Sequence, residues 1–154
     1  MLKYFSLLLG GAALLLTTPL TSLAQEEMGE EEPEFHYLTV TTFDAPSGEE
    51  GQKVGEWIER VIAPSARMNP NVLSFRAAQH NWGSNSAQVA FISEYPNWAA
   101  IEADCEACDA WFEENVPEEG TLEREEWDEM AQAFFRAFNG HHDEIYAVNM
   151  NNAK

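Results

Sequence analysis

Three side chains in this sequence have the chemistry to bind or polarise a small organic molecule. Arg76 carries a planar guanidinium, which can hold a carboxylate or an enolate through two parallel hydrogen bonds. His80 follows on the same segment, and because histidine titrates near neutrality it can serve as a general base. Tyr146 offers a hydroxyl near the end of the chain. We predict these three residues as catalytic candidates, although a salt bridge for Arg76 and a solvated loop edge for His80 explain them equally well.

These candidates belong to segments with the pattern of β-strands. Residues 36–43, 72–80, 87–95 and 144–149 are rich in β-branched and aromatic residues, and apolar and polar residues alternate along them. The second and third segments are close enough in the chain to form a hairpin. The sequence therefore predicts four strands, the middle two of which are directly connected.

Three helices are predicted between the strands. The first begins at a capping box of Ser47 and Glu50 and is disrupted by Pro64. The second follows Asn97 as its cap, and a third, extra helix runs from about Leu122 to the Asn139-Gly140 stop. The buried stripes are expected to comprise Val54, Trp57, Ile58, Val61 and Ile62 in the first helix, Trp98, Ile101, Cys105, Cys108 and Phe112 in the second, and Trp127, Met130, Ala131, Phe134 and Phe138 in the third.

The order strand, helix, strand, strand, helix, extra helix, strand is the split β-α-β arrangement of the ferredoxin-like fold. With its tryptophan-rich helices, its central hairpin and the stretch AFISEYPNW at residues 90–98, where a strand runs into a capped helix, the chain resembles the dimeric α+β barrel superfamily over residues 35–150. That group includes the antibiotic-biosynthesis monooxygenase-like proteins. The resemblance implies an α+β fold with a four-stranded antiparallel sheet, and a homodimer in which two sheets face each other around a cavity. Members of the group bind or transform small molecules there, some with haem and some without a cofactor.

Strand alternation sorts the side chains onto two faces of the sheet. We expect Leu38, Val40, Leu73, Phe75, Val89 and Phe91 to meet the helices. The opposite face is then expected to carry Tyr37, Thr39, Thr41, Ser74, Arg76, His80, Gln88, Ala90, Ile92 and Tyr146. That mixture suits a partly enclosed ligand cavity, and equally a half-solvated or dimer-packed face without a ligand. We predict Tyr37, Thr39, Thr41 and Gln88 as ligand-binding residues, joined by Trp82, which lies in the hairpin loop and lines the cavity mouth or packs on a partner subunit.

The histidines near the sheet ends have side chains of the kind that bind metal ions. The run His141-His142-Asp143-Glu144 has suitable side chains, and Asp44 is expected to approach it. Neighbouring residues on a strand point to opposite faces, so we predict a solvated loop there and no metal site. A haem group would need an axial ligand that points into the cavity, and His80 is the candidate for it. The sequence does not decide whether the protein binds a cofactor. His36 is expected to stand alone at the other end of the sheet.

The pair Cys105 and Cys108 has the spacing of a redox motif. Both cysteines fall on the apolar stripe of the second predicted helix, where buried thiols behave as small hydrophobic residues. We therefore rank core thiols first, a local disulfide second and a catalytic dithiol third.

Residues 1–24 have the pattern of a secretory signal peptide. Lys3 gives a basic start, residues 5–16 are largely apolar, and Ser22-Leu23-Ala24 supplies small residues before the cleavage point. The apolar run is shorter than the about 20 residues that span a bilayer, so a retained anchor is the less favoured alternative. The prediction is an exported protein, periplasmic or extracellular, with no membrane contact after cleavage.

Charge narrows the class of partner. Residues 25–34 read as an acidic disordered leader, residues 35–150 as the folded domain and residues 151–154 as a disordered tail. Cleavage after Ala24 leaves 7 basic and 27 acidic residues, a net charge of −20, which excludes nucleic acid and anionic membranes as partners. The sequence thus predicts an exported homodimer that binds a small apolar or mixed-polarity molecule in a cavity on the sheet face. A monooxygenase-like or isomerase-like enzyme acting in that cavity and a structural protein without a ligand remain alternatives.

Overall fold

The structure is a computed structural model that describes residues 34–81 and 85–152, which belong to one compact unit, Glu32–Lys154. Its sheet has the order β2-β3-β1-β4, and every neighbouring pair is antiparallel. The strands are β1 (Phe35–Asp44), β2 (Ser74–Gln79), β3 (Gln88–Tyr95) and β4 (His142–Asn149). This order confirms the ferredoxin-like α+β fold with a four-stranded antiparallel sheet. The predicted signal peptide, nearly all of the acidic leader and Trp82 lie outside the described residues.

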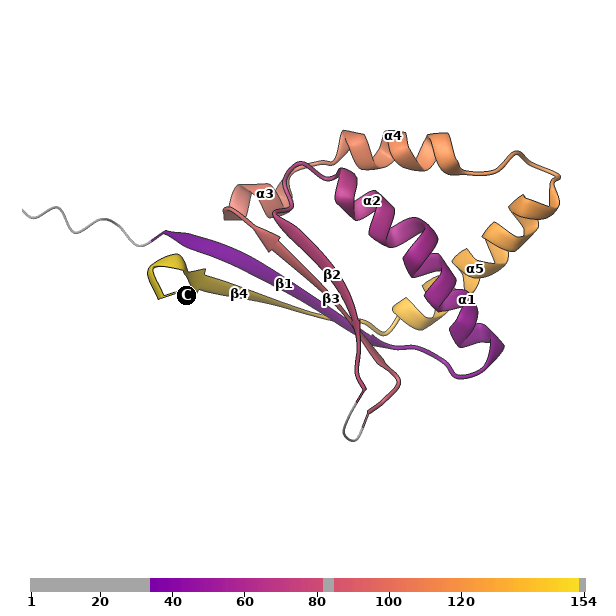
Figure 1. The fold of residues 1–154 in the computed structure, drawn as a ribbon, viewed down its shortest axis with the longest axis horizontal. Helices are drawn as coiled ribbons and strands as arrows, with labels where there is room; N and C mark the ends of the chain where they lie inside the picture. Colours follow the sequence, from indigo (N-terminus) through magenta and orange to yellow (C-terminus); the bar gives the residue numbers. More distant parts are fainter. Residues whose placement is uncertain (1–33, 82–84, 153–154) are drawn as a thin grey trace, which may run out of the picture. The chain divides into compact units, whose positions relative to one another are not determined.

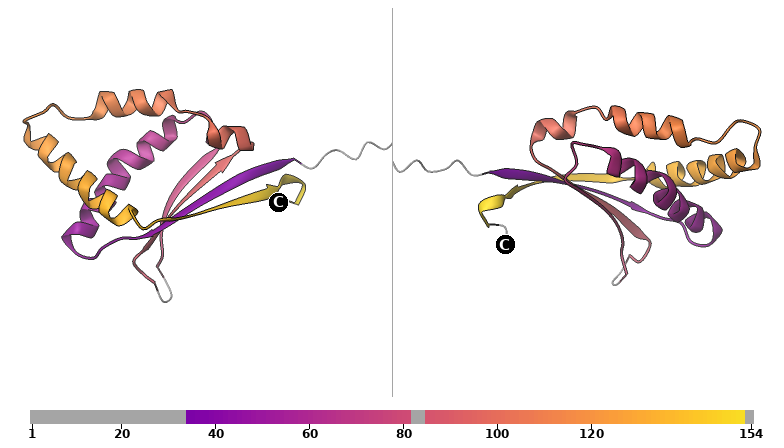
Figure 2. Two further views of the ribbon diagram at one scale, coloured as in Figure 1. Left: turned by 180° about the vertical axis from the view of Figure 1, so that it is seen from behind. Right: turned by 45° about the horizontal axis from the view of Figure 1, so that its top comes forward.

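The helices pack on one face of this sheet (Figure 1), and the two further views agree (Figure 2). A continuous helical segment joins β1 to β2 and comprises α1 (Glu49–Trp57), a π-helical turn (Ile58–Ile62) and α2 (Ala63–Met68). Between β3 and β4 lie α3 (Trp98–Glu102), α4 (Glu106–Asn115) and α5 (Leu122–Phe138), and a short 3₁₀ turn (Met150–Asn152) follows β4. None of the helices in residues 34–81 and 85–152 is long and apolar enough to cross a membrane.

Two details of the first helical segment differ from the predictions. Its N-cap is Gly48, with φ of 74° and no side-chain cap, so the capping box of Ser47 and Glu50 was wrong. The disruption predicted at Pro64 takes the form of a π-helical turn before it, and the helix continues through the proline. Pro64 lies in the first turn of α2, directly after the π-helical turn, where its missing N–H costs little because the backbone pairing has already shifted.

The second predicted helix is two helices. Asn97 caps α3 as predicted, since its side chain accepts a hydrogen bond from the Ala100 N–H at 2.9 Å. The helix ends at Glu102, and α4 begins after Cys105, whose sulfur takes the capping position. The expected continuous stripe was therefore wrong, and its two ends, Trp98 and Phe112, are 47% and 41% exposed.

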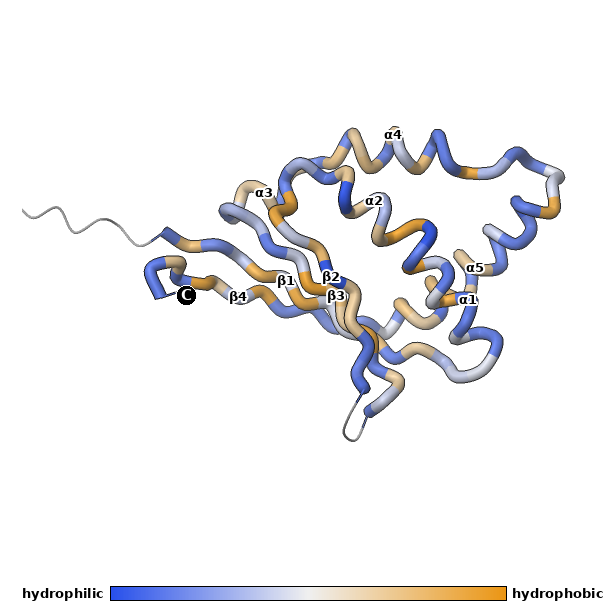
Figure 3. Tube along the Cα trace, viewed as in Figure 1, coloured by the Kyte–Doolittle hydropathy of each residue, from blue (hydrophilic) through white to orange (hydrophobic). Residues whose placement is uncertain are grey.

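The core lies between α1, α5 and the β1–β3 part of the sheet. Its buried members are Phe43, Val54, Trp57, Val61, Val89, Phe91, Trp127, Met130, Ala133 and Phe134. Aromatic rings meet edge to face at its centre: the centroids of Trp57 and Trp127 lie 5.0 Å apart, and those of Phe43 and Phe91 5.4 Å apart. Figure 3 shows that apolar positions recur along α1 and α5. The buried residues of both helices belong to one cluster with those of the sheet. The predicted stripes of the first and third helices thus supply most of this core.

The strand register corrects one of the predicted faces. Phe43 is buried and pairs with Val89, and Thr41 pairs with Phe91, so Tyr37, Thr39 and Thr41 share the helix side of β1. Leu38 and Val40 point to the other side. The assignment of β1 was therefore inverted, because the pattern was anchored on its two aliphatic residues and not on the phenylalanine at its end. The faces of β2 and β3 and the outward placement of Tyr146 agree with the prediction.

Candidate functional site

The sheet face away from the helices, here called the open face, carries no helix in the described part of the chain (Figures 1 and 2). Cross-strand pairing orders its side chains in rows from β2 to β4. One row is Ser74, Glu94, Leu38 and Tyr146; the next is Arg76, Ile92, Val40 and Glu144; the third is Ala78, Ala90, Thr42 and His142. Apolar side chains thus occupy the two central strands of the middle row, and charged ones stand at its edges.

A polar cluster lies at one end of the open face. His36 Nδ1 and Glu94 Oε1 are 2.8 Å apart, and the Ser74 hydroxyl donates to Glu94 Oε2 at 3.1 Å. The hydrogen bond with His36 is the main cause that holds the pKa of the Glu94 carboxyl below its ordinary value of 4.5, with Arg76 adding a smaller attraction. His36, expected to stand alone, is therefore part of a charge-bearing group. The sequence offered only residue types here, because the partners are 58 and 20 residues apart.

Tyr146 has a carboxylate partner on its own strand. Its hydroxyl donates to Glu144, and His142 Nε2 lies 3.6 Å from the other oxygen of that carboxylate. The hydrogen bond raises the pKa of Tyr146 above 10.0 and lowers the pKa of Glu144 below 4.5. Near neutral pH Tyr146 is therefore a protonated donor beside a charged carboxylate. The ring is 48% exposed, in keeping with its place on an edge strand of the open face.

Arg76 stands on the other edge strand. It is exposed, pairs across the sheet with Ile92, and takes part in none of the ion pairs found among the described residues. The salt bridge weighed as its alternative role is thus absent from residues 34–81 and 85–152. Three strand spacings of about 4.8 Å separate β2 from β4, so Arg76 and Tyr146 of one copy do not converge on a single small ligand.

His80 lies just beyond the end of β2, near the hairpin. Its Nδ1 is 2.6 Å from the Asn85 carbonyl oxygen, and its backbone N–H donates to the Gln88 carbonyl at 2.8 Å. Asn85 also donates to Asp44 at 2.8 Å, which ties the hairpin to the end of β1. The side chain is exposed, so this structure presents His80 as a loop-edge histidine on the far edge from Tyr146. Gln88 lies on the open face as predicted, next to Asp44 in the register.

The three residues predicted on β1 sit elsewhere than expected. Tyr37 packs edge to face on Trp98, with ring centroids 5.7 Å apart, on the helix side of the sheet. Thr41 donates a hydrogen bond to Asp143 on the same side, and Thr39 pairs with Ile145. Their ligand-binding role stays a prediction, but they do not share a face with Arg76 and Gln88.

No metal-binding geometry forms around the C-terminal histidines in the described residues, where no three His, Cys, Asp or Glu side chains are arranged to hold an ion. His141 Nε2 approaches Asp143 at 3.1 Å, and its ring stacks on Phe138 with centroids 4.2 Å apart. His142 is turned to the open face, since it pairs with Thr42. The two histidines therefore serve different faces.

A cleft that the sequence did not reveal lies on the helix side, between the α1–α2 segment and β2. Its volume is about 390 Å³, and its lining consists mainly of small and apolar residues: Ala45, Gly51, Val54, Gly55, Ile58, Glu59, Ala63, Arg67, Phe75, Ala77, Ala78, Gln79 and Val89. Glu59 and Arg67 are exposed and lie at its mouth. The π-helical turn borders it, and such turns are frequent at functional sites. The only sequence signal was a pair of glycines one turn apart within a helical pattern.

Gly51 and Gly55 occupy their positions in α1 for different physical reasons. A Cβ on Gly51 would lie 2.1 Å from the Pro46 carbonyl oxygen, so this position needs glycine for the close approach of the β1–α1 loop. A Cβ on Gly55 would meet nothing within 4 Å. Gly55 thus leaves space open at a helix position where alanine would be more stable.

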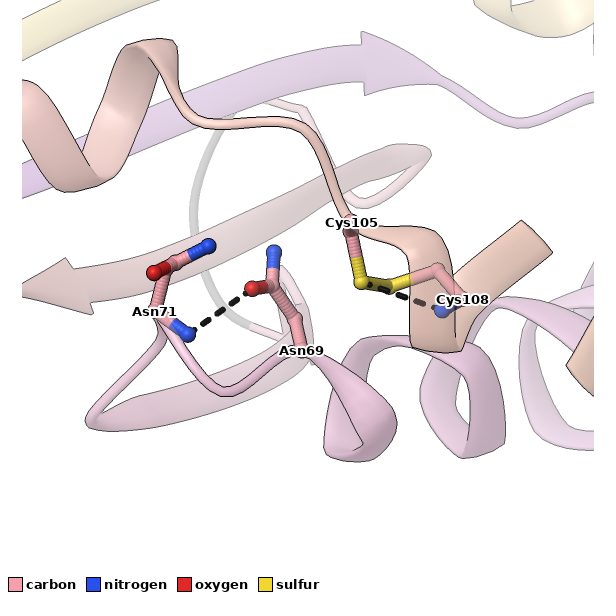
Figure 4. The surroundings of a disulfide bond; sticks show 4 residues. All are labelled: Asn69, Asn71, Cys105 and Cys108. Atoms are coloured by element: carbon pink, nitrogen blue, oxygen red, sulfur yellow. Dashed lines mark hydrogen bonds between the residues drawn. A yellow bond between two sulfur atoms is a disulfide. The ribbon is translucent and has the colours of Figure 1, made fainter. Parts of the chain in front are cut away.

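Cys105 and Cys108 form a disulfide at the start of α4 (Figure 4). Both residues are half-buried, and neither belongs to the core cluster. The leading prediction of core thiols was therefore wrong, and the second-ranked disulfide is what the structure contains. The error follows from reading one helix through the break at residues 103–105.

No protein-family model and no curated protein matches the chain. Several solved structures are similar to it over about three quarters of its length. A dimeric ferredoxin-like protein from an uncultured marine organism has a TM-score of 0.45 and 11% identity, covering 75% of this chain and 89% of that one. A NIPSNAP family protein from Agrobacterium tumefaciens has a TM-score of 0.44 and 12% identity, covering 72% and 90%.

A candidate antibiotic biosynthesis monooxygenase from Caulobacter crescentus has a TM-score of 0.42 and 10% identity, covering 76% of this chain and 90% of that one. At these values the similarity says nothing of a ligand or a reaction, and the ferredoxin-like assignment stands on the strand order and register. Among the structures similar to this chain are proteins described as dimeric and ferredoxin-like and one described as a candidate antibiotic biosynthesis monooxygenase.

Proposed function

We propose that this protein is an exported homodimer that binds a small, mainly apolar molecule. The observation that carries the binding role is the cleft of about 390 Å³ between the α1–α2 segment and β2. Its volume falls in the range of about 300 to 1,000 Å³ typical of small-molecule sites. Most of its lining residues are small or apolar, and Glu59, Arg67 and Gln79 add polar groups, a mixture that is usual for such a site.

The chemistry of the lining defines the class of ligand. Val54, Ile58, Phe75 and Val89 offer apolar contacts, so burial of hydrocarbon drives binding. Arg67 and Glu59 at the mouth can each bind one polar end of the molecule, and Arg67 favours a carboxylate or a phenolate. We therefore infer a compact organic molecule with a polar group at one end.

The dimer is proposed from the open face. Ile92 and Val40 form its apolar middle, with Arg76 at the β2 edge and Glu144 at the β4 edge of the same row. If two copies face each other about an axis parallel to the strands, β2 of one lies over β4 of the other, and each Arg76 meets the partner's Glu144. The two-fold symmetry then forms two Arg76–Glu144 ion pairs between the copies.

An enzyme is the second candidate, and the polar groups of the open face support it. Tyr146 is held protonated by Glu144, and His36 is paired with Glu94, so donors and an acceptor stand around an apolar strip. Two facing copies would enclose this strip as the cavity expected from the sequence. Arg76 of one copy and Tyr146 of the other would then approach each other, which a single copy does not allow. We propose a monooxygenase-like or isomerase-like reaction in this cavity as the second candidate function. The contribution of His80, Gln88 and Trp82 to it is part of the same proposal.

Native mass spectrometry of the full chain, recovered after expression in a secreting bacterium, tests these proposals together. A dimer that lacks residues 1–24 and carries extra mass supports export, pairing and binding at once. Gly55→Leu fills the cleft, and Arg76→Ala removes a charge from the open face. Loss of the extra mass in Gly55→Leu alone assigns the ligand to the cleft, whereas loss in Arg76→Ala alone assigns it to the cavity between the sheets. A bare monomer contradicts both binding and pairing.

A further inference from the structure

The disulfide lies where a helix begins. Cys105 is the N-cap of α4, and Cys108 is in its first turn, with its backbone N–H directed at Cys105 Sγ at 3.1 Å. Both cysteines are half-buried, so small reagents and extended chains can reach them. α4 has 10 residues, long enough for aligned peptide dipoles to act on its N-terminus.

This position favours sulfur chemistry. The N–H groups and the dipole of a helix N-terminus stabilise a thiolate, the reactive form of cysteine. After reduction, the Cys105 sulfur would lie at that N-terminus, already directed toward the Cys108 N–H. The two cysteines are only three positions apart in the sequence, so the disulfide closes a very short loop. A disulfide constrains the unfolded state less as its loop shortens. A stabilising role alone therefore accounts poorly for this bond.

The surroundings indicate what would react there. Asn69 and Asn71 lie beside the disulfide (Figure 4), and the Asn69 side chain is held by the Asn71 N–H at 2.9 Å. Met68, which ends the neighbouring α2, and Phe112, one turn beyond Cys108, are 46% and 41% exposed. Amide groups that can pair with a peptide backbone thus lie beside the disulfide, and exposed apolar side chains occur on the two neighbouring helices.

The negative charge around the disulfide determines which thiol compounds can approach it. Asp104, Glu106 and Asp109 are exposed acids within four residues of the disulfide, and no lysine or arginine occurs between residues 77 and 123. Such a site repels anionic thiols and attracts a cysteine with basic neighbours.

From this arrangement we propose that Cys105 and Cys108 form a thiol–disulfide exchange site for extended, basic cysteine-containing peptides. A thiolate of a peptide dithiol attacks Cys108 Sγ; a peptide–Cys108 disulfide forms, the Cys105–Cys108 bond breaks, and Cys105 leaves as the thiolate that the helix N-terminus stabilises. The second peptide thiolate then attacks the peptide sulfur of this mixed disulfide, so a peptide disulfide forms. Cys108 leaves as a thiolate and takes a proton from water. The peptide loses two electrons and the protein gains two, and a small-molecule disulfide oxidises the protein again.

The full chain, purified as the disulfide, is mixed with synthetic peptides that carry two cysteines flanked by lysines or by glutamates. Acid-quenched samples are followed by mass spectrometry. We expect the lysine peptide to be oxidised about tenfold faster than the glutamate peptide. A single-cysteine lysine peptide should give an adduct on Cys108, because Cys105 is the better leaving thiolate. A linear peptide of residues 102–110 with its own disulfide is the control without the fold, and it should lack the preference for Cys108.

The variant Asp104→Asn with Glu106→Gln should bring the two rates close together while a neutral peptide reacts as before. A disulfide that stays closed in excess peptide dithiol overturns the proposal, and so does a rate equal to that of the control peptide. Adducts divided evenly between the two cysteines would also overturn it, because the helix N-terminus would then have no effect.

Discussion

The two glycines of α1 provide the sharpest test of the cleft, because the same substitution should have opposite effects one helical turn apart. Gly55→Ala adds a methyl group that meets nothing within 4 Å. In a helix interior, alanine is favoured over glycine by about 0.5 to 1 kcal/mol. We expect a gain of about 0.5 to 1 kcal/mol in the free energy of unfolding, all of it from helix propensity, because the methyl makes no new contact.

Gly51→Ala is the matched change. Its Cβ would lie 2.1 Å from the Pro46 carbonyl oxygen and 3.2 Å from the carbonyl carbon, so backbone must move. Overpacking of this kind costs about 1 to 3 kcal/mol, which exceeds the helix-propensity gain. The net expectation is a loss of about 1 to 2 kcal/mol, so the two variants should differ by about 1.5 to 3 kcal/mol.

Urea unfolding followed by tryptophan fluorescence measures both values, since Trp57 and Trp127 are buried in the core. For a domain of this size, 1 kcal/mol corresponds to roughly 4 °C in Tm, which calorimetry resolves. Equal effects of the two substitutions, or a loss in Gly55→Ala, would refute the open space beside Gly55 and with it the cleft. If the cleft holds a ligand, Gly55→Ala should weaken its binding while the protein itself becomes more stable.

Three further outcomes follow from the open face. Arg76→Glu or Glu144→Arg alone should weaken the dimer about fivefold, the equivalent of about 1 kcal/mol for two exposed pairs, and the double variant should restore it in sedimentation equilibrium; no restoration would exclude the crossed pairing. The lowered pKa of Glu94 contributes stability above pH 4.5 that is lost as the pH falls through the folded-state value, so Glu94→Gln should flatten the acid limb of stability measured by urea unfolding. The phenol of Tyr146 should titrate above 10.0 in an NMR titration of the labelled ring, and Glu144→Gln should bring the midpoint back down; an unchanged midpoint would contradict the hydrogen bond.

The fold was predictable because the strands and helices differ clearly in period. On β2 and β3 the alternation leaves one choice of buried face, marked by Phe75 and Ala77 and by Val89 and Phe91. The order of the elements then selects the ferredoxin-like topology. On β1 both faces carry apolar residues, since Leu38 and Val40 belong to the open face and Phe43 to the core. The alternation of residues within one strand cannot show which of its two faces is buried. The pairing of Phe43 with Val89 decides the question, and that is a long-range contact.

The candidate site was less predictable because its groups meet only through the register. Glu94 was not singled out, yet it joins His36 and Ser74 from two other strands. The break between α3 and α4 carries neither proline nor glycine, and a sulfur atom caps the second helix where an oxygen is usual. The cleft depends on how far α1 stands from β2, which no local pattern encodes. Gly55 was the one local sign of it.

The distribution of charge supports the separate roles proposed for the two faces. Lys53, Arg124 and Arg136 form ion pairs with acids on the helices, so these bases are used within the helical layer. On the open face, Arg76 and the histidines stand near only a few of the 27 acidic residues. A chain with a net charge of −19 repels its own copies almost everywhere else. The open face is therefore the surface where a second copy is opposed least, and the helix-side cleft remains accessible to a ligand when that face is covered.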